Sequence, residues 1–233
     1  MHAEEARASW LERFPAGFEE REVAGDLELA VYVDDVPADL READIADVAP
    51  GWEQRWRSFH RPVVVGPLWV GPPWEEPPEG LTPVVIDPGR AFGTGSHATT
   101  RLCLAYLLEL PRGSLLDIGC GSGVLAIAAA KLGFAPVGAV DVDPVSVETT
   151  TANARANGVG LDVLRLDALR HRLPESDVAV ANIALEVADR IAARSATLVT
   201  SGYFADAKPS PPGFVHADRR TDDRWAADRW RRK

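Results

Sequence analysis

The sequence predicts an α/β fold in which a doubly wound parallel sheet follows a smaller α+β segment. Apolar strands alternate with helices of ten or more residues in residues 84–233, a pattern typical of parallel sheets that helices cover. The chain has 233 residues, of which 46% are hydrophobic and 26% charged, so it can bury the core of one large domain with a small appendage. A proline-rich stretch separates the two parts.

Residues 1–60 form the smaller part and are rich in Glu, Asp and Arg. Apolar residues at helical spacing predict a helix over residues 4–14. Two strands, EEREVA and LELAVYV, are expected next, joined at Gly25 and Asp26, because the second alternates apolar and polar residues. Further helices are expected over residues 38–48 and 52–59.

Residues 61–83 contain seven prolines and separate the two parts. Such a segment cannot be helical and is poor sheet interior, because proline has no backbone donor. We therefore predict a small α+β domain over residues 1–60, an extended linker over 61–83 and a larger domain over 84–233. Four tryptophans lie in or beside the linker, and they either pack the small domain against it or form a binding surface: Trp52, Trp56, Trp69 and Trp74.

The larger domain begins with a strand, PVVID, and a helix, TTRLCLAYLLEL. The apolar strand SLLDIG and the helix GVLAIAAAKLG, which ends at Gly133, form the next unit. The strand APVGAVDVD precedes a helix with Pro144 in its first turn and Gly158 at its end, the positions that proline and glycine favour. The remaining elements are the strands LDVLRLD and DVAVANIA, the helix LEVADRIAARS, the strand ATLVTSGYF and a hairpin of FVHADRR and WAADRWRR.

A glycine-rich turn after the strand SLLDIG is the strongest local signal. Gly119, Gly121 and Gly123 follow Asp117 with one residue between each. Glycines let a ligand approach the backbone, and the start of the next helix offers free N–H groups. Asp141, 22 residues after Gly119, ends the following strand, where a carboxylate can accept both hydroxyls of a ribose. Together these features predict a nucleotide-type cofactor, although a tight turn without a ligand is the alternative.

The glycine spacing argues against a dinucleotide site. The pattern G-x-G-x-x-G would require glycine at Val124, and Gly123 comes one residue early. A NAD-dependent oxidoreductase is therefore disfavoured.

The turn and Asp141 resemble class I S-adenosylmethionine-dependent methyltransferases. Two motifs, DPGRAFGTGSHATTRLCL over residues 87–104 and VANIA over 180–184, are similar to the ribosomal protein L11 methyltransferase family. The resemblance covers residues 50–205 and implies a mostly parallel, seven-stranded Rossmann-like sheet. Residues 1–49 resemble the family's substrate-recognition domain only loosely and are shorter, and the helix before the final hairpin is reduced to ADAKPSPPG.

The resemblance also implies S-adenosyl-L-methionine as the cofactor and a role for each residue that contacts it. Thr100 would hold the methionine carboxylate and Asp117 the ammonium group. Gly119 and Gly121 would let the cofactor pass close to the backbone. Asp141 would bind the ribose hydroxyls.

Two more residues complete the expected site. Asn182 ends a strand where the reactive methyl should point, and it would accept the N–H groups of a substrate amine and aim its lone pair. A dry pocket would favour the neutral amine, because desolvation disfavours the charged form. Phe92 lies in a loop of small residues suited to a mobile lid and would pack against the ligand, a core position being the alternative.

Four polar residues near these motifs have simpler explanations. Asp143 can cap the helix that starts at Pro144. Asp167 would lie near the adenine or be an exposed strand-end acid. His97 precedes a helix and is as consistent with capping as with a base, and Cys120 is a small filler of the glycine turn.

Composition excludes several classes of protein. With 35 acidic and 25 basic residues, the formal charge of -10 argues against broad nucleic-acid binding, and it suits a basic ribosomal partner. Two cysteines make no disulfide framework, and no Cys/His spacing predicts a metal. No signal-peptide pattern is present, and no apolar run reaches the ~18 residues of a membrane span. We expect a cytoplasmic monomer without metal, membrane or nucleic-acid partners.

These arguments favour an S-adenosylmethionine-dependent N-methyltransferase that acts on Lys side chains or the α-amine of ribosomal protein L11. The short N-terminal part motivates one alternative, methylation of another protein lysine or of a small-molecule amine. The other alternative is an inactive methyltransferase-like binding module, against which the intact Gly119, Gly121, Asp141 and Asn182 argue.

Overall fold

The computed structural model describes residues 19–23, 26–31, 61–87 and 95–233. The chain divides into two compact units, residues 1–59 and 60–233. In the first unit, β1 (Glu19–Val23) and β2 (Asp26–Ala30) pair antiparallel, which confirms the predicted hairpin. The helices predicted over residues 4–14, 38–48 and 52–59 lie outside the described residues.

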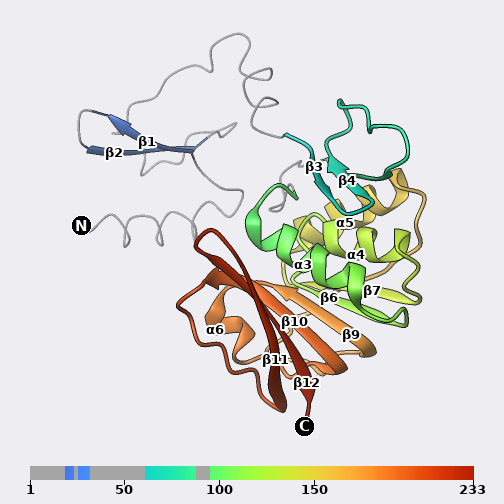
Figure 1. Ribbon diagram of the computed structural model, residues 1–233, viewed down its shortest axis with the longest axis vertical. Coiled ribbons are helices and arrows are strands. Elements are labelled where there is room, and N and C mark those ends of the chain that lie inside the picture. The colour runs from blue at the N-terminus through green and yellow to red at the C-terminus, as the bar shows by residue number, and fades with distance from the viewer. Residues whose placement is uncertain (1–18, 24–25, 32–60, 88–94) are drawn as a thin grey trace. The chain divides into compact units, whose positions relative to one another are not determined.

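The second unit is built on a seven-stranded sheet with the order β11-β12-β10-β9-β6-β7-β8 (Figure 1). Five strands are parallel: β6 (Leu115–Ile118), β7 (Val137–Asp141), β8 (Asp162–Arg165), β9 (Glu175–Asn182) and β10 (Arg194–Phe204). The hairpin of β11 (Phe214–Asp222) and β12 (Trp225–Arg232) adds two antiparallel strands. The predicted doubly wound, mostly parallel seven-stranded sheet is confirmed.

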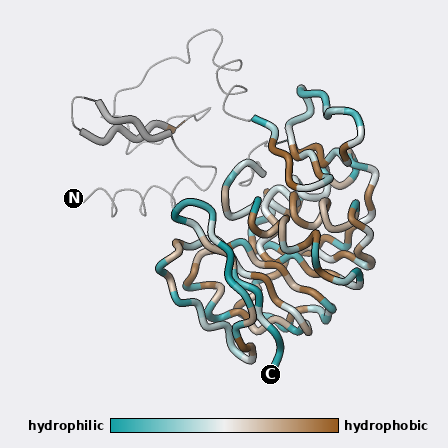
Figure 2. Tube along the Cα trace, viewed as in Figure 1, coloured by the Kyte–Doolittle hydropathy of each residue, from teal (hydrophilic) through white to brown (hydrophobic). Residues whose placement is uncertain are grey.

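Three helices cover one face of this sheet: α3 (Ala98–Glu109), α4 (Val124–Lys131) and α5 (Pro144–Ala156). Alternate strand residues point to opposite faces, so Leu115 packs under these helices while Leu116 faces the other side. Because both faces are buried, the central strands are continuously apolar, and Figure 2 shows hydrophobic segments gathered there and a hydrophilic β11–β12 hairpin.

The opposite face is covered by short connections instead of long helices. The predicted helix LEVADRIAARS is wrong beyond its first turn, because α6 spans only Leu185–Ala188 and β10 already begins at Arg194. Ile191 and Ala193 are 0% and 3% exposed and pack in the cluster on this face. Burial of these two side chains under the sheet overrides the helical spacing of the sequence. As the sequence indicated, residues 205–213 contain no helix.

A separate three-stranded sheet is formed by β3 (Val63–Val65), β4 (Leu68–Gly71) and β5 (Thr82–Val85). β3 and β4 are antiparallel, and β4 and β5 are parallel. Trp69 is 2% exposed, so this tryptophan packs in the interior. Val84 of β5 is also fully buried. The strand predicted from PVVID is β5, and the proline-rich segment before it contains two short strands. The boundary between the predicted linker and the larger domain stays a prediction.

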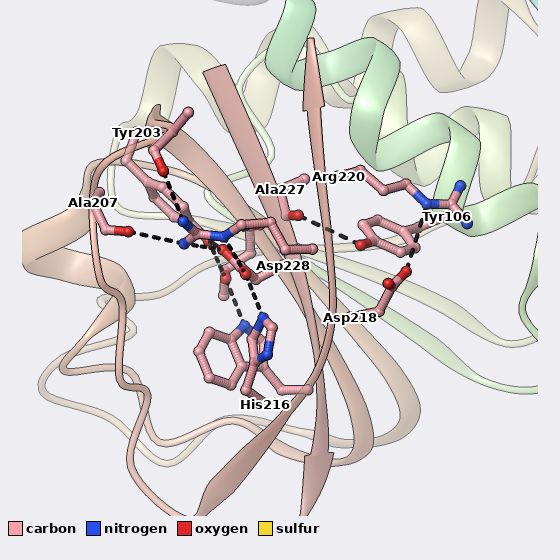
Figure 3. Close-up of polar contacts among 12 residues, drawn as sticks. Tyr106, Tyr203, Ala207, His216, Asp218, Arg220, Ala227 and Asp228 are labelled. Atoms are coloured by element: carbon pink, nitrogen blue, oxygen red, sulfur yellow. Dashed lines mark hydrogen bonds and ion pairs between the residues drawn. The ribbon is translucent and has the colours of Figure 1, made fainter. Parts of the chain in front are cut away.

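A buried carboxylate joins the β11–β12 hairpin to β10 (Figure 3). Asp228 is 0% exposed, and its Oδ1 accepts hydrogen bonds from His216 Nε2 at 2.7 Å and Arg219 Nε at 2.8 Å. Its Oδ2 accepts from Tyr203 Oη and from a second nitrogen of Arg219, both at 2.9 Å. The two oxygens of Asp228 thus accept four hydrogen bonds, which compensate for the burial of the carboxylate.

Arg219 also fixes the loop over residues 205–213. Its guanidinium donates to the backbone carbonyl of Ala205 at 2.8 Å and to that of Ala207 at 2.9 Å. The loop is thus held by the Arg219 side chain, whose charge is balanced by Asp228, and by Asp189, whose Oδ1 accepts the N–H of Ser210 at 2.6 Å. In the described part of the chain, no helix is long and apolar enough to cross a membrane.

Candidate functional site

The carboxyl ends of β6, β7 and β9 meet at one edge of the sheet. β6 lies between β7 and β9 and is parallel to both, so the strand order reverses at β6. Open α/β sheets bind ligands at such a switch point, outside the carboxyl ends of the strands. Five predicted site residues lie near these strand ends or in the turn after β6: Asp117, Gly119, Gly121, Asp141 and Asn182. A sixth, Thr100, lies in the first turn of α3. Phe92 lies outside the described residues.

The glycine turn fixes the carboxylate of Asp141. Gly119, Gly121 and Gly123 have φ angles of 75°, 53° and 83°, a region that favours glycine. The N–H of Gly121 donates to Asp141 Oδ2 at 3.0 Å, and the N–H of Asp143 donates to Oδ1 at 3.0 Å. Each oxygen holds one backbone donor and keeps a lone pair for another. Asp141 is therefore preoriented to accept two hydroxyl groups.

Two side chains of α5 hydrogen-bond to the same glycine turn, a role that was not predicted from the sequence. Thr150 is fully buried and donates to the carbonyl of Gly121 at 2.9 Å, while Asn153 donates to the carbonyl of Ser122 at 2.9 Å. Thr150 and Asn153 are three residues apart, so they lie on the same face of α5, and this spacing could have indicated their shared role.

Asp117 is a buried acid beside the turn. It is 1% exposed, and its Oδ2 accepts the backbone N–H of Ala126 at 3.1 Å. Burial and, to a smaller extent, the charge of Asp141 raise the pKa of Asp117 to about 7, against the opposing effect of the Ala126 hydrogen bond. A cation bound nearby would lower this pKa and stabilise the ionised acid.

Asn182 and Thr100 contact each other across the edge. Asn182 Nδ2 donates to Thr100 Oγ1 at 3.3 Å, from the end of β9 to the first turn of α3. Thr100 is 3% exposed and Asn182 is half-buried. This bond engages the amide nitrogen of Asn182, and Oδ1 is the acceptor of the same group. The pair combines a hydroxyl with an amide acceptor.

Asp143 and Asp167 both accept backbone N–H groups, and the expected place of Asp167 near the adenine stays a prediction. Asp143 caps α5, because its Oδ1 accepts from the N–H of Val145 at 3.1 Å and its Oδ2 from that of Ser146 at 3.2 Å. Asp167 accepts the N–H of Leu169 at 2.9 Å and stabilises a turn after β8.

His97 and Cys120 also have partners that explain them. His97 caps α3 and contacts Thr99 Oγ1 at 2.7 Å, and burial, Arg101 and Arg224 lower the pKa of its imidazole. Burial raises the pKa of the Cys120 thiol, which keeps it neutral. Within the described ranges, no cluster of His, Cys, Asp or Glu could hold a metal ion.

The sequence is similar to those of known methyltransferases. A model described as ribosomal protein L11 methyltransferase (PrmA) matches residues 16–206. A protein of that name from Symbiobacterium thermophilum is 44% identical over 144 residues, 58% of this chain and 46% of that protein. One from Methylococcus capsulatus is 41% identical over 181 residues, 72% of this chain and 60% of that protein. The chain spans about half the length of the curated relatives that it matches.

The fold is also similar to that of a solved structure. The ribosomal protein L11 methylase from Lactobacillus delbrueckii subsp. bulgaricus superimposes with a TM-score of 0.64 and 26% sequence identity. The match covers 75% of this chain and 100% of that one.

Proposed function

This chain belongs to the ribosomal protein L11 methyltransferase family, and we propose that it transfers a methyl group from S-adenosyl-L-methionine to amines of ribosomal protein L11. One observation carries the proposal: the glycine turn, the preoriented Asp141 and the Asn182–Thr100 pair converge on one sheet edge. Such an edge can hold a nucleoside on one side and a nucleophile on the other.

The residues of the edge fit the chemical groups of this cofactor. Asp141 would accept the two ribose hydroxyls, because each of its oxygens keeps a lone pair. The ammonium group suits Asp117, because a positive charge beside this buried acid would offset the desolvation that raises its pKa. Thr100 would hold the methionine carboxylate, and the turn of Gly119 and Gly121 offers backbone that a ligand can approach. When bound, the cofactor supplies an electrophilic methyl group on a sulfonium.

Asn182 would position the amine that receives the methyl group. A lysine amine has an unperturbed pKa near ~10.4 and is mostly protonated at neutral pH, so its proton must leave to water before transfer. The Asn182 Oδ1 then accepts an N–H of the neutral amine and aims its lone pair. Thr100 keeps the amide in this orientation through the 3.3 Å hydrogen bond.

The remaining expectations are part of the same proposal. Phe92 would pack against the cofactor. Residues 1–60 would recognise the protein substrate, and residues 61–83 would link that domain to the catalytic one. A ribosomal substrate places the enzyme in the cytoplasm, and we propose that it acts as a monomer.

The direct test is transfer of isotope-labelled methyl from S-adenosyl-L-methionine into unmethylated L11, read by mass spectrometry. The expected result is label in L11 with this chain and almost none with the Asn182→Ala variant. A chain that binds the cofactor but leaves L11 unlabelled would overturn the substrate assignment. A chain that binds no cofactor would overturn the whole proposal.

A second candidate keeps the chemistry and changes the substrate to another protein lysine or a small-molecule amine. The short N-terminal part motivates it, and the family model matches this part only from residue 16 onward. Label in other proteins of a ribosome-free extract, with none in L11, would support it.

A further inference from the structure

The residue after Asn182, Ile183, lies between two glycines from different parts of the sheet. Gly119 belongs to the turn after β6, and Gly202 belongs to β10. Both have positive φ angles, 75° and 105°. Ile183 also packs against two apolar clusters, one under the sheet and one beside α6. Its position therefore depends on both glycines.

Gly202 allows the backbones of β10 and of Ile183 to touch. It is the extra residue of a bulge, because Ser201 pairs with Ala227 of β12 and Tyr203 pairs with the next residue, Ala226. A Cβ atom at Gly202 would lie 2.3 Å from the carbonyl oxygen of Ile183 and 2.7 Å from its carbonyl carbon. Beside this contact, the N–H of Ile183 donates to the carbonyl of Ser201 at 2.9 Å. These atoms are backbone and cannot rotate away.

Gly119 makes the complementary contact with the side chain. A Cβ atom at Gly119 would lie 2.5 Å from Ile183 Cγ2. The isoleucine therefore occupies the space beside the glycine turn and keeps the end of β9 at a set distance from it. Asn182 is bonded directly to Ile183, so the same contacts determine where its amide lies relative to the turn.

We infer that Gly202 and Ile183 are positioning residues for Asn182. The bulge at Gly202 places the Ile183 backbone, and the Ile183 side chain spaces Asn182 from the turn that would carry the cofactor. The inference rests on the proposed function, because it explains how the amine acceptor and the cofactor site are held in register. It adds two residues that act through Asn182.

The test compares Gly202→Ala with Gly133→Ala. Gly133 ends α4 with a φ of 92°, and a Cβ atom there would meet nothing within 4 Å, so this control carries similar backbone strain without the clash. We expect Gly202→Ala to lower kcat for methyl transfer at least tenfold, with the cofactor Kd changed less than about threefold. Gly133→Ala should leave kcat within twofold. Equal losses in both variants would overturn the inference.

A double-mutant cycle separates positioning from general damage. If Gly202 acts through Asn182, Gly202→Ala should change turnover little in an Asn182→Ala background, because coupled residues are not additive. A full additional tenfold loss there would contradict the inference. Amide hydrogen exchange gives a readout that needs no activity: the Ile183 N–H should exchange at least tenfold faster in Gly202→Ala, and unchanged protection would also overturn it.

Ile183→Ala provides a second variant if Gly202→Ala does not fold. It removes Cγ2 from Gly119 and should lower kcat at least fivefold, whereas Val187→Ala, which shortens another side chain packed on the same cluster, should not. Equal effects would contradict the inference. A wild-type chain that binds cofactor but methylates no amine would instead refute the proposed function, while the hydrogen-exchange comparison still tests the positioning.

Discussion

The two halves of the seven-stranded sheet use carboxylates in opposite ways. Asp141, half-buried at the end of β7, accepts two backbone N–H groups and keeps lone pairs for a ligand. Asp228, inside β12, accepts four hydrogen bonds from Tyr203, His216 and Arg219 and has no free acceptor capacity. The comparison teaches that burial of a carboxylate does not itself mark a site. Unused hydrogen-bonding capacity at a strand end does.

The largest expected effect is on catalysis: substitution of Asn182, in the first half, should lower turnover while the protein stays folded. Asn182→Ala should lower methyl transfer by roughly 10²–10³-fold, the effect of losing one well-placed polar group in an active site. Cofactor affinity should change less than about twofold. Steady-state kinetics and calorimetric titration measure the two quantities.

Asn157→Ala is the matched control for Asn182→Ala. Asn157 accepts the N–H of Val85 at 2.9 Å and donates to its carbonyl at 2.6 Å, so it ties α5 to β5. Its loss should cost stability while turnover per folded molecule persists. Comparable losses of turnover in both variants would break the comparison.

In the second half the same kind of substitution should alter folding. Asp228→Asn leaves the Arg219 guanidinium without its charge partner and should destabilise the protein by about 3 kcal/mol, as removal of one member of a buried ion pair does. Chemical denaturation measures this. Asp218→Asn, whose half-exposed carboxylate lies 3.7 Å from Arg220, should cost less than about 1 kcal/mol. Similar costs would show that the Asp228 cluster is not the structural centre of this half.

Asp117 combines the two cases, because it is buried like Asp228 and, like Asp141, is proposed to bind the cofactor. Its pKa is about 7 in the folded protein and 3.8 in the reference state, so the folded state favours the protonated acid. In the ligand-free protein, the loss of stability caused by burying Asp117 is absent below about pH 4, grows between about pH 4 and pH 7, and is complete above about pH 7. Asp117→Asn should therefore make the ligand-free protein more stable than the wild type at pH 8 and nearly equal to it at low pH.

The cofactor should reverse that order. Cofactor affinity of the wild type should fall severalfold as the pH drops from 8 to 6, because binding requires the ionised acid. Asp117→Asn should bind more weakly and lack this part of the pH dependence. Titration calorimetry at the two pH values, with denaturation of the ligand-free proteins, checks both statements. A wild type whose affinity matches the variant at pH 8 would remove Asp117 from the site.

The half that carries the site was also the half that the sequence predicts best. Gly119, Gly121 and Asp141 lie at the ends of apolar strands, and parallel strands bring such ends to one edge whatever the details of packing. The contacts of Asp228 with Arg219, and of Gly202 with Ile183, depend on strand order and on a bulge that no local pattern encodes. The short α6 has the same origin, because burial of Ile191 depends on the sheet that it covers.

The measurement that tests the account most directly is the affinity of S-adenosyl-L-methionine for the wild type, Asp141→Ala and Asp143→Ala. The two acids lie two residues apart, but Asp141 is oriented toward the glycine turn and Asp143 caps α5. We predict that Asp141→Ala weakens binding at least tenfold, and that Asp143→Ala costs about 1 kcal/mol of stability with little loss of affinity. Unchanged affinity in Asp141→Ala, or an equal loss in both variants, would contradict the account.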